Sequence, residues 1–244
     1  MKNILNKNNN KLLLILLVLV IGAILLIVLI NTDKKQKDPF DNNKNDNKEI
    51  ANVTPDDVKK LYNILTSNTC NIKYTFDFSN NKTIKTEDMS ETDKLTIIFN
   101  NLKYNNIIKD KISIEEYNTY AKNILGNITK IPSTFKDFNY DGNTYNIEKN
   151  KIIKNTSTCN TKEEYKSTLY SYSYNLYDLS IYINYIEIKN NKAYDLDGKL
   201  IDTYTKENEE RIMNSATSYV YNFKKNTNGY YLQQVSLAVK ETTK

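Results

Sequence analysis

The sequence predicts an α+β fold, with short helices packed on an antiparallel β-sheet, preceded by one N-terminal transmembrane helix and a flexible stalk. Three observations lead to this prediction. Residues Leu12–Ile30 form an unbroken apolar run. Residues 54–126 repeat a helix-capping residue followed by apolar residues three and four positions apart. After residue 126, apolar residues alternate with polar ones between Asp-Gly and Asn-Gly turns.

The apolar run Leu12–Ile30 is predicted to cross the lipid bilayer as a signal anchor. It contains no charged side chain, and at about 1.5 Å per residue it spans roughly 28 Å, close to the hydrocarbon thickness. A cleaved signal peptide is the alternative, because residues 1–11 form a basic leader. However, the run is longer than a usual signal-peptide core, and neither a small-residue cleavage site nor a cysteine follows it.

The charges that flank the run hardly decide its orientation. They are Lys2, Lys7 and Lys11 before it, and Lys34, Lys35 and Lys37 after it. A short basic leader usually stays in the cytoplasm, and long C-terminal domains translocate largely regardless of their charge. We therefore expect a single-pass protein of the cell membrane, with a cytoplasmic leader at residues 1–11 and an extracytoplasmic C-terminal domain.

Residues 31–52 are predicted to form a polar flexible stalk, because they contain almost no apolar side chain to offset their ordering entropy. The rest of the 244-residue chain, residues 53–244, suits one extracytoplasmic α+β domain. Its core can draw on most of the 20 Tyr and 7 Phe of the chain, since these side chains bury a large area each.

Three short amphipathic helices are predicted early in this domain. The first begins at the N-cap Thr54, with Pro55 in its first turn and Asp57 completing a capping box. The other two begin after Ser90 and Ser113. Their expected buried faces are Val58, Leu61, Tyr62 and Leu65; Leu95, Ile98, Phe99 and Leu102; and Tyr117, Ala121 and Ile124, before the terminating Gly126.

Strands are predicted wherever apolar residues alternate with polar ones. One strand-like segment, residues 71–78, interrupts the helices, and the other strands follow them as an antiparallel meander. The expected features are a hairpin at Asp141-Gly142, a strand at 170–176, its partner at 179–188, a turn at Asp197-Gly198, and a last hairpin around Asn228-Gly229. The returning strand of that last hairpin is expected to be the edge of the sheet.

Cys70 and Cys159 are the two cysteines of the chain, and both lie in the predicted domain. A disulfide between them would close a loop of about 90 residues and would stabilise the fold by about 4–5 kcal/mol in the chain-entropy model. Such a bond requires an oxidising, extracytoplasmic side. The alternative is two unrelated buried thiols. Neither cysteine belongs to a Cys-x-x-Cys motif, which argues against zinc or redox chemistry.

The composition argues against several functions. The chain has 34 basic and 29 acidic residues in mixed order and a net charge of +5, so no basic stripe for nucleic acid is visible. It has no histidine, the commonest catalytic base and metal ligand. Its many Asn and Lys residues are typical of AT-rich coding. We predict no metal, no cofactor and no enzymatic activity.

One cluster of acids keeps an enzymatic alternative open. It consists of Asp195, Asp197, Asp202, Glu207, Glu209 and Glu210. Two such carboxylates facing each other across a pocket could hydrolyse a glycan or the cell wall. The alternative interpretation is structural, because Asp197 precedes Gly198 in a turn pattern and the glutamates suit a solvated face.

Tyr170, Tyr172 and Tyr174 alternate with serines along one predicted strand. Aromatic rings on one strand face can bind sugars or peptides, so we identify these tyrosines as a candidate binding face. The alternative is that they belong to an ordinary core in a chain where tyrosine stands in for other large residues.

The basic leader, the apolar helix and the closing segment FKKNTNGYYLQQVS resemble uncharacterised signal-anchored, single-pass membrane proteins of AT-rich low-GC Gram-positive bacteria. Helices followed by a curved antiparallel sheet also resemble an NTF2-like or cystatin-like cone. The resemblance to such a cone implies a binding or assembly module more often than an enzyme. Neither resemblance carries over a functional residue.

These observations favour a membrane-anchored extracytoplasmic interaction module of the cell envelope, whose partner is an envelope protein or polymer. A carboxylate-dependent glycan or wall hydrolase is the first alternative. A membrane-tethered adaptor that faces the cytoplasm is the second, because the flanking charges leave the reversed orientation open.

Overall fold

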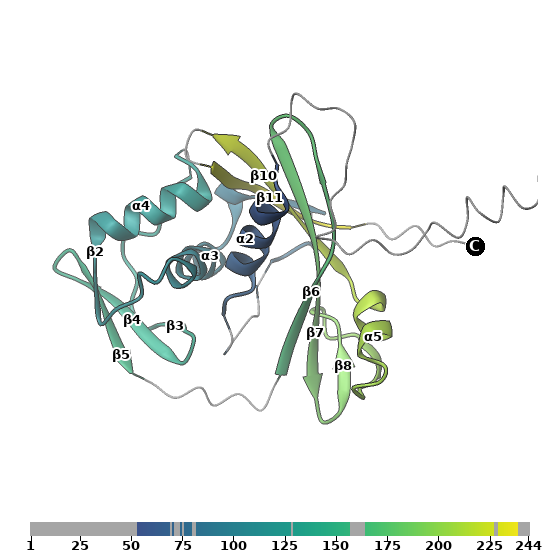
Figure 1. Cartoon of the computed structure of the whole chain (residues 1–244). Coiled ribbons are helices and arrows are strands. Elements are labelled where there is room, and N and C mark those ends of the chain that lie inside the picture. Colours follow the sequence, from purple (N-terminus) through teal and green to yellow (C-terminus); the bar gives the residue numbers. More distant parts are fainter. Residues whose placement is uncertain are drawn as a thin grey trace, which may run out of the picture. The chain divides into compact units, whose positions relative to one another are not determined.

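The computed structural model describes residues 53–68, 70, 74, 76–79, 82–127, 129–156, 164–226 and 229–238. These residues have an α+β fold in which helices pack on antiparallel sheets (Figure 1). The predicted fold class is therefore confirmed for this part of the chain. The predicted leader, transmembrane helix and stalk, residues 1–52, lie outside it.

A seven-stranded sheet has the strand order β1-β11-β10-β7-β8-β9, and β6 pairs with the other edge of β7. Its strands are β1 (Thr83–Lys85), β6 (Glu164–Tyr174), β7 (Asp178–Lys189), β8 (Lys192–Tyr194), β9 (Leu200–Thr203), β10 (Ser218–Asn226) and β11 (Gly229–Leu237). A four-stranded sheet has the order β2-β5-β4-β3. Its strands are β2 (Lys111–Ser113), β3 (Phe138–Tyr140), β4 (Asn143–Glu148) and β5 (Lys151–Thr156). The helices are α2 (Pro55–Leu65), the 3₁₀ helix η1 (Thr86–Asp88), α3 (Glu91–Tyr104), α4 (Ile114–Leu125) and α5 (Glu209–Ser215).

The first helix, α2, begins as the sequence predicts. The side chain of Thr54 accepts a hydrogen bond from the backbone N–H of Asp57 at 3.1 Å, and the carboxylate of Asp57 accepts one from the N–H of Thr54 at 3.0 Å. Pro55 occupies the first turn, where its missing N–H costs nothing. The buried residues are Val58, Leu61, Ile64 and Leu65. Tyr62, predicted to be buried, is half-buried.

Helix α3 is buried on almost all sides, whereas the sequence predicts an amphipathic helix. The Ser90 side chain accepts a hydrogen bond from the N–H of Asp93 at 3.1 Å and begins the helix as predicted. Every residue from Asp93 to Leu102 is buried. The predicted apolar face does lie in the core. The face predicted to be exposed to solvent is also covered, because α2 and α4 both pack against this helix.

Helix α4 ends at Gly126, as predicted. Gly126 has φ 81° and ψ 164°, a conformation that is essentially restricted to glycine. A Cβ atom at this position would lie 2.7 Å from Cδ2 of Tyr231. Gly126 therefore both ends α4 and allows the chain to pack closely against β11.

Two antiparallel sheets take the place of the single predicted meander. Asp141 and Gly142 join β3 to β4 with positive φ angles of 50° and 73°, which confirms the predicted hairpin. This hairpin belongs to the smaller sheet, which also includes β2, directly before α4. In the larger sheet, β1 pairs with β11 from Thr83–Ser236 to Lys85–Gln234. The last strand is therefore not the sheet edge, because residues far earlier in the chain cover it.

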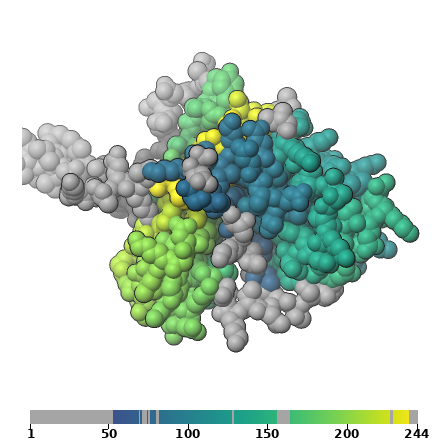
Figure 2. Space-filling view, turned by 180° about the vertical axis from the view of Figure 1, so that it is seen from behind, coloured from purple at the N-terminus to yellow at the C-terminus, as the bar shows by residue number. Residues whose placement is uncertain are grey.

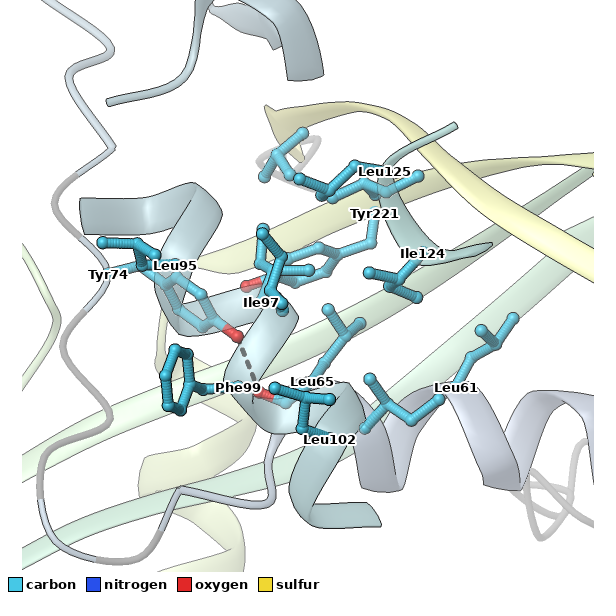
Figure 3. Packing of buried hydrophobic residues seen from close by; sticks show 14 of the residues in the cluster. Leu61, Leu65, Tyr74, Leu95, Ile97, Phe99, Leu102, Ile124, Leu125 and Tyr221 are labelled. Atoms are coloured by element: carbon cyan, nitrogen blue, oxygen red, sulfur yellow. Dashed lines mark hydrogen bonds between the residues drawn. The ribbon is translucent and has the colours of Figure 1, made fainter. Parts of the chain in front are cut away.

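The segment 71–78 does not form the predicted strand at its described residues, which lie outside any strand. Its aromatic rings pack on the face of the larger sheet instead. Tyr74 stacks on Phe76 with ring centroids 4.9 Å apart, and its edge meets Tyr221 at 6.2 Å. The Tyr74 hydroxyl donates to the backbone oxygen of Leu65 at 2.8 Å, shown as a dashed line in Figure 3.

The opposite face of the larger sheet carries α5, which the sequence analysis missed. Ile186 and Ala193 of the sheet pack there with Ile212 of α5 in a second, smaller apolar cluster. The side-chain amide of Asn184 donates to the backbone oxygen of Met213 at 2.7 Å. The helix has only 7 residues, and the side chain of its N-cap Asn208 makes no hydrogen bond to the first turn of the helix, so the usual sequence signals are weak.

Candidate functional site

Three exposed large apolar side chains lie in the part of the β6–β7 hairpin between Tyr170 and Asp178, two of them in the turn itself. Tyr170 is 46% exposed, Leu176 39% and Tyr177 61%. Among the described residues, the other exposed large apolar side chains are Tyr104 and Leu200, and neither belongs to this hairpin. Figure 1 shows the turn between β6 and β7 at the end of the hairpin away from α5, and in Figure 2 the green atoms of the hairpin reach the top of the surface.

A β-bulge takes Tyr170 out of the predicted alternation. Leu169 pairs with Ile183 and Ser171 pairs with Tyr182, so Tyr170 is an extra residue without a partner in register. A bulge of this kind redirects a side chain from the place where strict alternation would put it. Tyr170 is accordingly much more exposed than its neighbour Leu169, which is buried.

Tyr172 and Tyr174 lie on the face of β6 that points to the core. They pair with Ile181 and Leu179, which are fully buried, and paired residues share a face. Their rings stack at 6.3 Å with an angle of 17°. Partial burial and the neighbouring Tyr174 raise the pKa of Tyr172 above its ordinary value. The structure therefore brings two of the three predicted tyrosines together and separates Tyr170 from them.

The turn that displays Leu176 and Tyr177 has a well-fixed backbone. The side-chain oxygen of Asn175 accepts hydrogen bonds from the N–H groups of Tyr177 and Asp178, both at 2.9 Å. The backbone N–H of Asn175 donates to the oxygen of Asp178 at 2.9 Å. The N–H of Lys225 on β10 donates to the oxygen of Tyr177 at 2.7 Å. A partner that contacts this turn would not need to order its backbone first.

Among the hollows of the described part of the chain, two lie away from this hairpin. The larger, of about 240 Å³, is lined by Lys85, Thr86, Glu87, Leu125, Thr129, Tyr231, Leu232, Gln233 and Gln234. The smaller, of about 110 Å³, lies between α2, α3, α4 and the start of β11. The Tyr230 hydroxyl beside it is buried and has no hydrogen-bond partner. Both are below the roughly 300–1,000 Å³ of usual small-molecule sites.

Four of the six acids at residues 195–210, namely Asp195, Asp202, Glu207 and Glu209, make hydrogen bonds in turns or ion pairs. Asp195 accepts a hydrogen bond from the N–H of Lys199 at 2.8 Å. Asp202 pairs with Arg211, and this contact holds the pKa of Asp202 below its ordinary value. The pKa of Glu207 is also lowered, by hydrogen bonds within its own turn. A glycosidase acid needs a raised pKa, the opposite direction.

Glu209 belongs to a polar cluster with Lys166 and Tyr204, which connects α5 to β6. The ammonium group of Lys166 lies 2.6 Å from the Glu209 carboxylate and 2.6 Å from the Tyr204 hydroxyl, which also donates to Glu209. The Lys166 bond lowers the pKa of Glu209. Partial burial lowers the pKa of Lys166, but the bonds with Glu209 and Tyr204 outweigh it and raise that pKa overall. A lysine held in its charged form cannot act as a nucleophile or base.

Two other predictions depend on residues outside the described ranges. No free cysteine occurs in the described residues, but Cys159 lies in the gap 157–163, so its disulfide with Cys70 stays a prediction. The run Leu12–Ile30 also lies outside, and no helix of the described part is long and apolar enough to cross a membrane. Within these same ranges no group of three or more Cys, Asp or Glu side chains is placed to hold a metal ion.

The alternating pattern does not identify Leu176 and Tyr177 as candidate site residues, because it predicts a strand that continues to residue 176. The signal that could have found them is the spacing of Asn175 and Asp178. An Asn followed three residues later by Asp is typical of a side-chain-capped turn, and apolar residues inside such a turn have no core to enter. Comparison of the chain with models of known protein families, with curated proteins and with solved structures found no match.

Proposed function

We propose that the chain is a membrane-anchored interaction module of the cell envelope, which binds its partner through the end of the β6–β7 hairpin. The observation that carries this proposal is the exposure of Leu176 and Tyr177 side by side in the turn at the end of the hairpin, with Tyr170 exposed further along β6. Soluble domains rarely leave apolar side chains grouped in water, and such groups mark interaction sites. The fixed turn backbone supports the same conclusion, because it reduces the entropy that binding costs.

The anchor in this proposal is the apolar run Leu12–Ile30, and residues 31–52 are the flexible link to the domain. The leader stays in the cytoplasm and the domain lies outside it, as the general rule for short leaders and long C-terminal domains suggests. A reversed orientation would make the chain a cytoplasm-facing adaptor with the same binding surface. The orientation experiment in the Discussion separates the two.

The experiment places a photoreactive benzoylphenylalanine at Tyr177 in the full chain, in its native cells. We expect cross-links to one envelope component after illumination. The matched control carries the same group at Tyr104, a 37% exposed tyrosine of α3 that is remote from the hairpin in sequence. Equal cross-linking at both positions, or none at Tyr177, would contradict a binding function of the hairpin end.

A further inference from the structure

Leu176 indicates what kind of partner the hairpin end meets. It lies in the turn beside Tyr177 and exposes an aliphatic side chain that can neither stack on a sugar ring nor donate or accept a hydrogen bond. Glycan sites rely on flat aromatic faces, but the stacked Tyr172 and Tyr174 face the core. Exposed tyrosine beside an exposed aliphatic residue suits the boundary between lipid headgroups and acyl chains.

Two lysines stand beside this apolar group. Lys224 is exposed and pairs in register with Asp178, directly after the turn. Lys225 follows it; its backbone is bonded to Tyr177, and its ammonium group lies over the ring of Tyr230, 5.9 Å from the centroid. Asp178 is the one acid of the turn, and its carboxylate already accepts a hydrogen bond from the Asn175 amide at 3.0 Å. Lysines next to apolar side chains complement the phosphates of an anionic membrane surface.

Under the proposed function, a membrane lies within reach of the domain. The domain follows the apolar run Leu12–Ile30 after the polar residues 31–52. A flexible link of that length has a root-mean-square extension of roughly 26 Å. The bilayer that holds the anchor is therefore present at high effective concentration for any lipid-binding part of the domain.

We propose that the end of the β6–β7 hairpin inserts Leu176 and Tyr177 into the interface of an anionic bilayer, with Lys224 at the level of the headgroups. This inference rests on the proposed function and names the partner of the same surface. Because the turn backbone is already fixed by Asn175, insertion requires no rearrangement of the hairpin. The domain would then lie on the membrane at a second point besides its anchor.

The absence of tryptophan from the chain allows a direct test. The full chain is reconstituted at low density in phosphatidylcholine–phosphatidylglycerol vesicles that contain brominated lipid, and carries Tyr177→Trp as its one indole. We expect a blue-shifted emission and quenching by bromine at least about two-fold stronger than for the matched control Tyr104→Trp. Equal quenching of the two variants would overturn the lipid proposal.

A second variant tests the role of charge. Lys224→Gln in the Tyr177→Trp background should lower the ratio of inserted to free hairpin about five-fold in anionic vesicles. The control is Lys199→Gln, which removes an exposed lysine at the β8–β9 turn and should change nothing. Equal effects of the two substitutions would contradict an interfacial position of Lys224.

Two further outcomes separate this inference from the proposed function. If the Tyr177→Trp signal appears only when the protein density in the vesicles is raised, the occupant is a second copy of the chain and the lipid proposal is wrong. If bromine does not quench Tyr177→Trp while the photoreactive group at Tyr177 still cross-links to a protein or polymer, the lipid proposal fails and the proposed function stands. Failure of both experiments would overturn both.

Discussion

The hydroxyl of Tyr140 donates a hydrogen bond to the side-chain oxygen of Asn100 at 2.8 Å, within the core between α3 and the smaller sheet. The amide of Asn100 in turn donates to the Tyr74 hydroxyl at 3.0 Å and to the backbone oxygen of Leu65 at 3.2 Å. One buried amide thus connects α2, α3, β3 and the segment that holds Tyr74. Burial raises the pKa of Tyr140 and Tyr74, so both hydroxyls stay protonated as donors.

Tyr140→Phe should destabilise the domain by about 1–3 kcal/mol, because it leaves the buried Asn100 oxygen without a donor. Urea unfolding followed by circular dichroism measures the change. The matched control is Tyr104→Phe at the exposed C-terminal end of α3, for which we expect less than about 0.5 kcal/mol. Similar values for the two substitutions would show that the Asn100 network contributes little.

Gly126→Ala should destabilise the domain more than Gly198→Ala. Both glycines have positive φ, 81° and 79°, so both substitutions incur a backbone cost of about 1–3 kcal/mol. Only at Gly126 does the added Cβ meet another group, Tyr231 at 2.7 Å, whereas nothing lies within 4 Å at Gly198. Thermal unfolding of the two variants measures the difference, and adding Tyr231→Ala to Gly126→Ala should remove part of it. Equal melting temperatures for the two glycine variants would contradict the close approach of α4 and β11.

The Lys166–Glu209 pair should stabilise the domain in a pH-dependent way. Its bond with Lys166 lowers the pKa of Glu209 in the folded state, so the unfolded state takes up the proton first as the pH falls. The contribution is therefore present above the unfolded pKa of about 4.3 and is lost as the pH falls through the lower folded pKa. Because the Glu209 side chain is 35% exposed, we expect only about 0.5–1 kcal/mol at pH 7.

Urea unfolding of Glu209→Gln at neutral pH and near pH 3 measures this contribution. The difference from the unmodified chain should shrink at the lower pH. The control is Glu210→Gln, the next residue along α5, whose side chain is exposed. A difference that is the same at both pH values would show that the ion pair is not its origin.

Detection of a disulfide between Cys70 and Cys159 would show that the domain lies on the extracytoplasmic side of the membrane. In intact cells, a membrane-impermeant maleimide should label both cysteines only after reduction, and mass spectrometry of an unreduced digest should recover the linked peptides. Reduction should also lower the free energy of unfolding, by up to about 4–5 kcal/mol. Labelling only after lysis, with both thiols free, would place the domain in the cytoplasm, where reducing systems keep thiols unpaired.

The sequence by itself determined the local structure at points where neighbouring residues decide the outcome. Thr54 with Asp57, Ser90, Ser113 and Gly126 set the ends of three helices, because a cap bonds to backbone groups within the same turn. Asp141-Gly142 set a hairpin for the same reason, since only these two residues must adopt positive φ. Such features can be recognised from a few consecutive residues.

Only the tertiary structure decided which elements become neighbours and which faces are covered. The three residues of β1 pair with β11 some 150 positions away, a contact that no local pattern encodes. The bulge at Tyr170 arises from the register between β6 and β7. Because of it, Tyr172 and Tyr174 face the core while Tyr170 is exposed, instead of all three lying on one face. Leu176 and Tyr177 became a candidate site because the sheet ends there and no helix of the described residues covers them. Exposure is a property of packing, so the apolar group at the hairpin end could be recognised only once the whole domain was assembled.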